Sequence, residues 1–164
     1  MSPESIERTV TGFRVDTDGD WVAVLDCHHG HHARHDPPWQ ERSWTQTEEG
    51  RQSMVGTTMG CPKCVWIEVP DGLVLDRSTT EWDEHTLPAA IRRDHRLAVG
   101  VWGSVRVLGG SIRFRFTDGR GGEVGDDGVL QVGMAQPIPP GRRHHLEPIG
   151  PTTVVVDFFV VGPA

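Results

Sequence analysis

A run of histidines and a pair of closely spaced cysteines constrain this chain more than any other feature. The stretch LDCHHGHHARHDPPW, from Leu25 to Trp39, places five of the nine histidines within nine positions that begin at Cys27. Further along the chain, CPKC puts Cys61 and Cys64 at the two-residue spacing of a metal-binding turn. Thiolates and imidazoles together favour Zn²⁺ over Mg²⁺ or Ca²⁺. The pattern therefore predicts a zinc site that ties distant segments together.

The expected ligand set is three cysteines and one histidine. Cys27 lies about 34 residues before the CPKC pair and supplies the third thiolate. The fourth ligand comes from the histidine run, in which His29 and His32 lie close enough to Cys27 to reach the same ion. Four protein ligands make a closed, structural site. A segment of about 65 residues with few large aliphatic side chains gains stability from such a site.

Two other interpretations of these residues stay open. CPKC can be a redox dithiol, although that motif normally accompanies a βαβ pattern, which this sequence does not show. The histidines can form a surface tract beside incidental cysteines. A disulfide framework is disfavoured, because the cysteines number three and the polar N-terminus, with no signal-peptide pattern, predicts a cytoplasmic protein.

The segment from Gly12 to Cys64 resembles a small bacterial domain family of unknown function. Its members carry Cys-Gly-His, His-x-x-His-x-Pro-Pro-Trp, Glu-Glu-Gly-Arg and Cys-Pro-x-Cys, and His28 stands here in place of the family glycine. The resemblance implies metal binding, with His29, His32 or His35 as the fourth ligand beside the three cysteines, and supplies no reaction. The residues that match are Cys27, His29, His32, His35, Pro37, Pro38, Trp39, Glu48 to Arg51, Cys61 and Cys64.

Alternating apolar residues predict that the chain is mainly β. GFRVD and WVAVLDC flank a turn at Asp18-Gly19 and read as a hairpin, and Thr47 is a candidate N-cap for a short helix. In SIRFRF, Ile112 and the phenylalanines alternate with arginines, as in a sheet with one buried face. We expect LPAAIRRDHR to form one helical turn or an edge strand.

Two domains are expected, separated by the turn signal VPDG at Val69–Gly72. Residues 1–66 hold every cysteine and predict a small zinc-ribbon-like α+β module. Residues 70–164 hold the longest strand-like runs and predict a cupin-type (jelly-roll) β-barrel.

The barrel prediction draws on a second motif. GMAQPIPPGRRHH places Gly133, Pro139, Gly141 and His144 at the spacing G-x5-P-x-G-x2-H, which resembles the second conserved motif of the cupin superfamily. The first cupin motif survives only in part, with His95 near the place of its first histidine. Because neighbouring strand residues face opposite ways, His144 and His145 cannot both point inward, and the spacing favours His144.

Residues 70 to 161 resemble the tellurite-resistance-associated TehB/YeaR-like cupin family more closely. The resemblance implies a compact barrel that binds a divalent ion or a small ligand in its interior. We expect a second metal site there, with Fe, Zn, Ni or Mn bound by a subset of His95, His144, His145, Glu147 and Asp157. The alternative is a barrel that has lost its metal and keeps these histidines as structural residues. The matching residues are Arg77 to Thr79, Thr86, Pro88, His95, Gly100 to Gly103, Gly110, Pro140, His144, Glu147 and Asp157.

These features predict a metal-binding cupin protein with a structural zinc module, active in a bacterial stress or tellurite/oxyanion response. A metal-dependent oxygenase or isomerase and a protein-interaction or ligand-sensing module are the alternatives, so enzymatic activity stays open. A net charge of −7 argues against nucleic-acid binding, and no apolar run is long enough to span a membrane. We expect a small-molecule or oxyanion ligand and a homodimer. The arginines Arg92, Arg93, Arg142 and Arg143 are expected to form a solvated face; the alternative is that they attract an anionic ligand to the barrel mouth.

Overall fold

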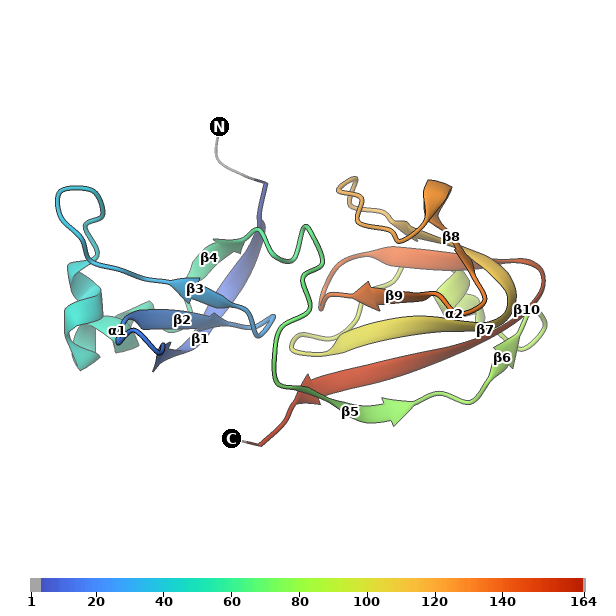
Figure 1. The fold of residues 1–164 in the computed structure, drawn as a ribbon, viewed down its shortest axis with the longest axis horizontal. Helices are drawn as coiled ribbons and strands as arrows, with labels where there is room; N and C mark the ends of the chain where they lie inside the picture. The colour runs from blue at the N-terminus through green and yellow to red at the C-terminus, as the bar shows by residue number, and fades with distance from the viewer. Residues whose placement is uncertain (1–3, 164) are drawn as a thin grey trace. The chain divides into compact units, whose positions relative to one another are not determined.

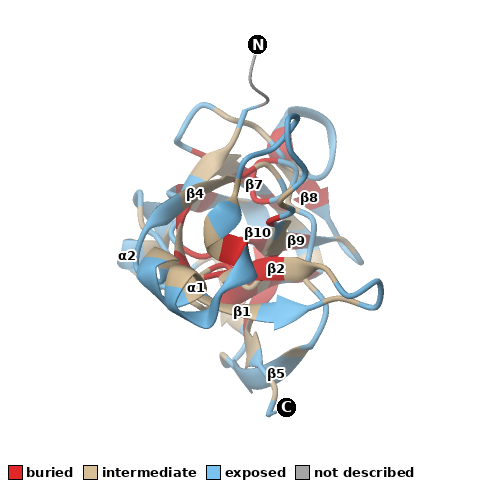
Figure 2. Ribbon diagram, turned by 90° about the vertical axis from the view of Figure 1, so that its left-hand side faces the viewer, coloured by how far each residue is buried: buried red, intermediate tan, exposed pale blue. Residues whose placement is uncertain are grey.

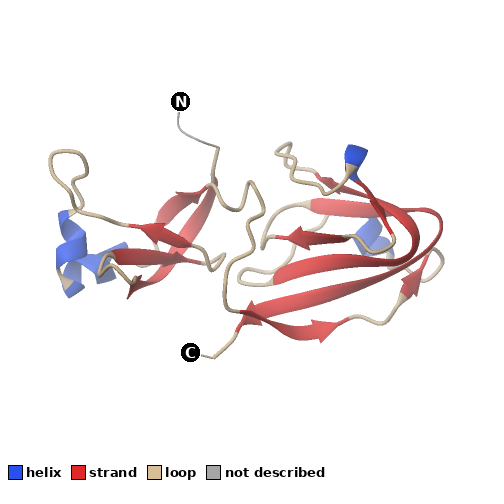
Figure 3. Cartoon of the chain, viewed as in Figure 1, coloured by secondary structure: helices blue, strands red, loops and turns tan. Residues whose placement is uncertain are grey.

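The computed structural model describes residues 4–163, which divide into two compact units, Met1–Cys64 and Val65–Ala164. Strands dominate both units, and the helices are short (Figure 3). This architecture confirms the mainly β class that the sequence predicts. Among the described residues, no helix combines the length and the apolar character that a membrane crossing requires.

The first unit is built on a four-stranded antiparallel sheet with the order β3-β2-β1-β4 (Figure 1). Strand β1 is therefore central to the sheet and pairs with β2 on one side and β4 on the other. A 3-10 turn and a short helix lie between β3 and β4 in the chain. The elements are β1 (Ile6–Val15), β2 (Trp21–Leu25), β3 (Gly30–His32), η1 (Ser43–Gln46), α1 (Glu48–Met54) and β4 (Thr58–Cys61).

The predicted hairpin joins β1 to β2. Val15 pairs with Trp21, and the turn between them is closed by the Asp16 carboxylate, which accepts hydrogen bonds from the amides of Asp18 and Asp20 at 2.9 Å. Gly19 adopts φ 86°, a conformation that glycine tolerates better than other residues. The Asp18-Gly19 turn is thus confirmed.

The predicted helix is also confirmed. Thr47 caps α1, because its Oγ1 accepts a hydrogen bond from the amide of Gly50 at 3.0 Å. Neither α1 nor α2 (Ala89–Arg92) carries a buried residue (Figure 2). Segment LPAAIRRDHR forms a helical turn at α2, and neither helix contributes a buried residue to the core of its unit.

The second unit is a six-stranded sheet that curls around its core, as a cupin-type barrel predicts (Figure 1). Its path is β5-β10-β7-β8, with β6 paired to β10 and β9 paired to β7. Two long antiparallel strands, β7 and β10, pair from one end of the unit to the other. The elements are β5 (Leu73–Ser78), β6 (Trp82–Asp83), α2, β7 (Trp102–Phe116), η2 (Asp126–Gly128), β8 (Val129–Gln131), β9 (Ala135–Ile138) and β10 (His144–Val161).

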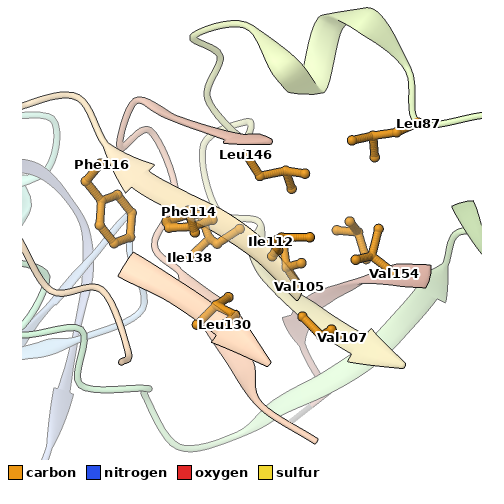
Figure 4. Packing of buried hydrophobic residues seen from close by; sticks show 11 residues of the cluster. Leu87, Val105, Val107, Ile112, Phe114, Phe116, Leu130, Ile138, Leu146 and Val154 are labelled. Atoms are coloured by element: carbon orange, nitrogen blue, oxygen red, sulfur yellow. The ribbon is translucent and has the colours of Figure 1, made fainter. Parts of the chain in front are cut away.

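The core of the second unit lies on the inner faces of these strands. Ile112 and Phe114 are fully buried and Phe116 nearly so, whereas Arg113 between them is exposed, which confirms the alternation read from SIRFRF. Figure 4 shows Leu146 and Val154 of β10 pointing into the same space as Ile112. Burying each such side chain contributes about 1.5–3 kcal/mol.

Candidate metal centre

Four side chains from two segments of the first unit, residues 27–29 and 61–64, converge on one point. The Nδ1 atom of His29 lies 3.4 Å from the Sγ atom of Cys27, 3.3 Å from that of Cys61 and 3.5 Å from that of Cys64. The Sγ atoms of Cys27 and Cys61 are 3.9 Å apart, and all four atoms lie within 4.8 Å of one another. All four residues are buried.

These distances match the edges of a tetrahedron around one zinc ion. Zn–S bonds of about 2.3 Å and Zn–N bonds of about 2.0–2.1 Å place tetrahedral ligands about 3.8 Å apart for two sulfurs and about 3.5 Å apart for sulfur and nitrogen. The three S···N separations and the measured S···S separation therefore leave room for an ion at the centre. The cluster can therefore hold a metal ion.

The turn between β2 and β3 places two of the four ligands. The amide of Leu25 donates to the carbonyl of His29 at 3.0 Å, and the amide of His28 donates back to the carbonyl of Leu25 at 2.8 Å. His28 adopts φ 71° at the tip of this turn. That left-handed conformation favours glycine, which explains why the resembling family carries glycine there.

The central strand β1 brings the two ligand-bearing turns together. Cys61 ends β4 opposite Ile6 of β1, and Cys64 lies in the turn that follows. On the other side, the amide of Asp26 donates to the carbonyl of Thr9 at 2.9 Å, which fixes the Cys27 turn against the same strand. Ligands that are far apart in sequence thus meet because their strands flank β1.

Thiol chemistry favours a cation at this point. Side-chain hydrogen bonds with Cys27, and to a smaller extent with Cys64, lower the pKa of Cys61. Side-chain hydrogen bonds with Cys27, and to a smaller extent with Cys61, raise the pKa of Cys64. The three thiols therefore cannot all ionise at this spacing unless a positive charge compensates them. The buried guanidinium of Arg8 supplies part of that charge, since it favours the ionised form of Cys64. Arg8 also lies 4.0 Å from the carboxylate of Asp26.

Two of the predicted histidine candidates lie outside the cluster. His32 is 61% exposed, and its Nδ1 lies 3.4 Å from a carboxylate oxygen of Asp16. His35 accepts a hydrogen bond from the amide of Arg42 at 2.9 Å. The expectation that either of them completes the site is corrected by this placement, because His29 fills the fourth position.

In the second unit, the structure brings together His95 and His144. The two residues exchange both backbone hydrogen bonds at 2.9 Å, and their ring centroids are 4.2 Å apart. His144 is 1% exposed and stacks on Phe114 at 5.4 Å, so it points inward as its motif spacing predicts. Both rings line a cavity of about 140 Å³.

The other three predicted ligands of the second site do not reach this cavity. His145 and Glu147 alternate with the buried His144 along β10, so they lie on its other face, opposite Arg115 and Arg113 of β7. The expectation that they join the site is corrected for that reason.

Asp157 belongs to a different network. Its carboxylate accepts a hydrogen bond from Ser78 at 2.6 Å and forms an ion pair with Arg106. The hydrogen bond from Arg106 lowers the pKa of Asp157. Because Val156 and Phe158 face the cavity, Asp157 between them faces away, and its predicted role as an inner ligand is corrected as well.

The barrel residues therefore do not fit the metal that a cupin fold implies. Catalytic metal centres commonly have three protein ligands, whereas this cavity offers two imidazoles among apolar side chains. Within the part of the chain that the structure describes, the four-residue cluster in the first unit is the one group of three or more potential ligands.

Two arginines are buried, against expectation for Arg142 and without a sequence signal for Arg8. Arg8 lies beside the thiols, and Arg142 is 2% exposed rather than part of a solvated face. The guanidinium of Arg142 donates to both carboxylate oxygens of Asp118 at 2.8 Å and lies 3.8 Å from the centroid of the Phe116 ring. The burial of Arg142 removes it from any anion-attracting surface.

Known protein families match both parts of the chain. DUF3565, a protein family of unknown function, matches residues 11–68, and the TehB-like domain matches residues 77–156. The protein YeaR from Escherichia coli strain K12 is 26% identical over 99 residues, which cover 57% of this chain and 83% of YeaR.

Two crystal structures are similar to part of this chain. One, of a protein from Escherichia coli strain K12, is 26% identical with a TM-score of 0.48 and covers 58% of this chain and 98% of its own. The other, TehB from Haemophilus influenzae, is 19% identical with a TM-score of 0.46 and covers 56% of this chain and 32% of TehB. The family matches confirm both resemblances read from the sequence: the DUF3565 model matches residues 11–68, and the TehB-like domain model follows at residues 77–156.

Proposed function

We propose that this chain is a zinc protein of a bacterial stress response. One Zn²⁺ closes the first unit through Cys27, His29, Cys61 and Cys64, and the TehB-like barrel meets a small ligand. The single observation that supports the zinc site is the set of S···N separations of 3.3–3.5 Å around His29. They equal the ligand spacing of a tetrahedral zinc ion.

The ion has a structural role in this proposal. All four ligands are buried, and together they fill a tetrahedral shell without leaving a position for water or substrate. The sheet of the first unit is small, and its apolar core consists of few residues around the cysteines themselves. Metal binding then contributes directly to folding, as in other small zinc modules.

The stress-response part of the proposal rests on the TehB-like match and on the tellurite association that this resemblance implies. A strain from which the gene is deleted should grow more slowly on tellurite than its parent. Complementation with the intact gene should restore growth, and complementation with a Cys61→Ser gene should not. Equal growth of the deleted and parent strains on tellurite would remove this part of the proposal.

The zinc site has a direct test. Protein purified without an affinity tag should contain one zinc per chain by elemental analysis. Removal of the ion with a chelator should unfold the first unit, seen as loss of its dispersed amide NMR signals, and added zinc should restore them. Protein that is folded and free of zinc, with no zinc uptake on titration, would refute the site.

A further inference from the structure

The interior of the barrel contains a small, nearly apolar cavity. Its volume is about 140 Å³, and seven of its nine lining residues are aliphatic or aromatic hydrocarbons, among them Val105, Ile138 and Leu146. A cavity of about 150 Å³ with such a lining stays dry and binds benzene. The space is therefore suited to one small apolar molecule rather than to a cluster of water.

One polar atom distinguishes this cavity from a simple packing defect. His144 is 1% exposed, and its Nδ1 lies 2.8 Å from the carbonyl oxygen of Arg142. Because a carbonyl can only accept a hydrogen bond, Nδ1 must carry the proton, and Nε2 keeps a lone pair. Nε2 has no hydrogen-bond partner among residues 4–163, although its ring lines the cavity.

The second imidazole repeats this arrangement at the side of the cavity. His95 is half-buried, and its Nδ1 lies 2.9 Å from the carbonyl oxygen of Arg93, so the same tautomer follows. Burial lowers the pKa of His144 to about 4, and the ring is therefore neutral at physiological pH. At His144 the cavity therefore offers a neutral hydrogen-bond acceptor and no side-chain donor.

This chemistry disfavours the charged ligands that the sequence leaves open. An oxyanion would lose its hydration on entering an apolar cavity and would find no donor to replace it. A divalent ion would find two nitrogens and would need water for its other positions, among hydrocarbon walls.

We propose that the barrel binds a small, uncharged, mostly apolar molecule with one hydrogen-bond donor, which it donates to Nε2 of His144. This inference rests on the proposed ligand-binding role of the barrel and names the class of ligand. The zinc site in the first unit does not depend on it.

Phenol is a suitable probe, with benzene as its matched control without a donor. Titrated into the intact, zinc-loaded protein, phenol should bind about three- to tenfold more tightly than benzene, the range that one neutral hydrogen bond provides. Amide signals of β7, β9 and β10 should shift. Nitrogen-15 spectra of the histidine rings should show Nε2 of His144 unprotonated before phenol is added and shifted after.

The variant His144→Leu keeps the apolar volume and removes the acceptor, so phenol should bind it no better than benzene does. The variant His95→Leu leaves the buried stacking of His144 on Phe114 in place. Because Nε2 of His144 is the proposed acceptor, this variant should still bind phenol more tightly than benzene. In the variants, zinc content should stay at one per chain, which separates failure of this inference from failure of the zinc site.

Several results would overturn the inference. Equal affinities for phenol and benzene would remove the role of Nε2, as would a proton found on Nε2 in the free protein. Amide NMR shifts confined to residues of a second pocket, which Trp102 and Phe159 line, would place the ligand there instead of in the barrel cavity. Tighter binding of tellurite than of phenol, or a second metal equivalent lost in His95→Leu, would show that the cavity serves a charged ligand.

Discussion

The Nδ1 atom of His29 lies 3.3 Å from the Sγ atom of Cys61, although 32 positions separate the two residues. This contact joins the turn after β2 to the end of β4 across the central strand β1. A single zinc ion at this contact would hold both turns at once.

Replacing His29 with alanine should abolish tight zinc binding. The loss should exceed the roughly 10–100-fold that removal of an outer-shell partner causes, because a direct ligand is removed. Competition with a zinc chelator measures the affinity. His32→Ala and His35→Ala are matched controls, since both histidines lie outside the cluster, and a zinc loss in either of them comparable to that in His29→Ala would contradict the assignment.

Replacing Arg8 with methionine should weaken zinc binding by about tenfold, the size of an outer-shell effect. Three thiolates and one imidazole around Zn²⁺ carry a net charge of −1, which the buried guanidinium near Cys64 offsets. Arg8→Lys keeps the charge and should retain most of the affinity. Arg14→Met is the matched control on the exposed part of β1, and chelator competition should find it unchanged. Equal zinc affinity in Arg8→Met and the original protein would deny Arg8 this role.

Replacing His28 with glycine should leave zinc content unchanged and raise the melting temperature slightly. The left-handed φ of 71° costs a non-glycine residue about 1–2 kcal/mol, which glycine avoids. Glycine loses more backbone entropy on folding, and this loss offsets about 0.5–1 kcal/mol of the stabilisation. His28→Ala keeps the strained backbone and should show no gain. Calorimetry of the three proteins gives the comparison, and a loss of zinc in His28→Gly would identify His28 as a ligand.

The strands and the cysteines were predictable because their signals are local. Alternation in SIRFRF follows directly from the two-residue period of a strand, and the CPKC spacing is that of a metal-binding turn. The identity of the histidine was not predictable in this way. It depends on the tight turn at His28, whose positive φ is not signalled by a non-glycine residue.

The side of the sheet to which each β10 side chain points was equally hard to predict from the sequence. The run TVVVDFFVV is apolar on both faces, so alternation does not reveal that Asp157 points away from the cavity. Burial of Arg142 depends on Asp118, which lies 24 positions earlier in another loop. Such pairs form only when the sheet curls, and no spacing rule connects them.

Replacing Gly110 with alanine should destabilise the second unit strongly. At φ 67°, an added Cβ would lie 1.9 Å from the carbonyl oxygen of Pro151, which is backbone and cannot move aside cheaply. Gly133 is the matched control, since it adopts φ 88° with no atom within 4 Å of a built Cβ. Both variants carry the cost of a positive φ, about 1–2 kcal/mol, so the difference in their denaturant midpoints isolates the clash. Equal midpoints would contradict the close approach of β7 to β10 at this bend.

Lowering the pH from 7 to 5 should reduce the free energy of unfolding of the second unit by about 2 kcal/mol through His144. Burial holds the pKa of His144 at about 4, below its ordinary value of 6.5, so protonation favours the unfolded state. The stabilisation is full above pH 6.5, is lost as the pH falls toward 4, and changes no further below that. Urea titrations followed through amide signals of β7 and β10 measure it. His144→Leu should lose this dependence, His145→Leu on the opposite face should keep it, and an unchanged slope in His144→Leu would show that another group titrates.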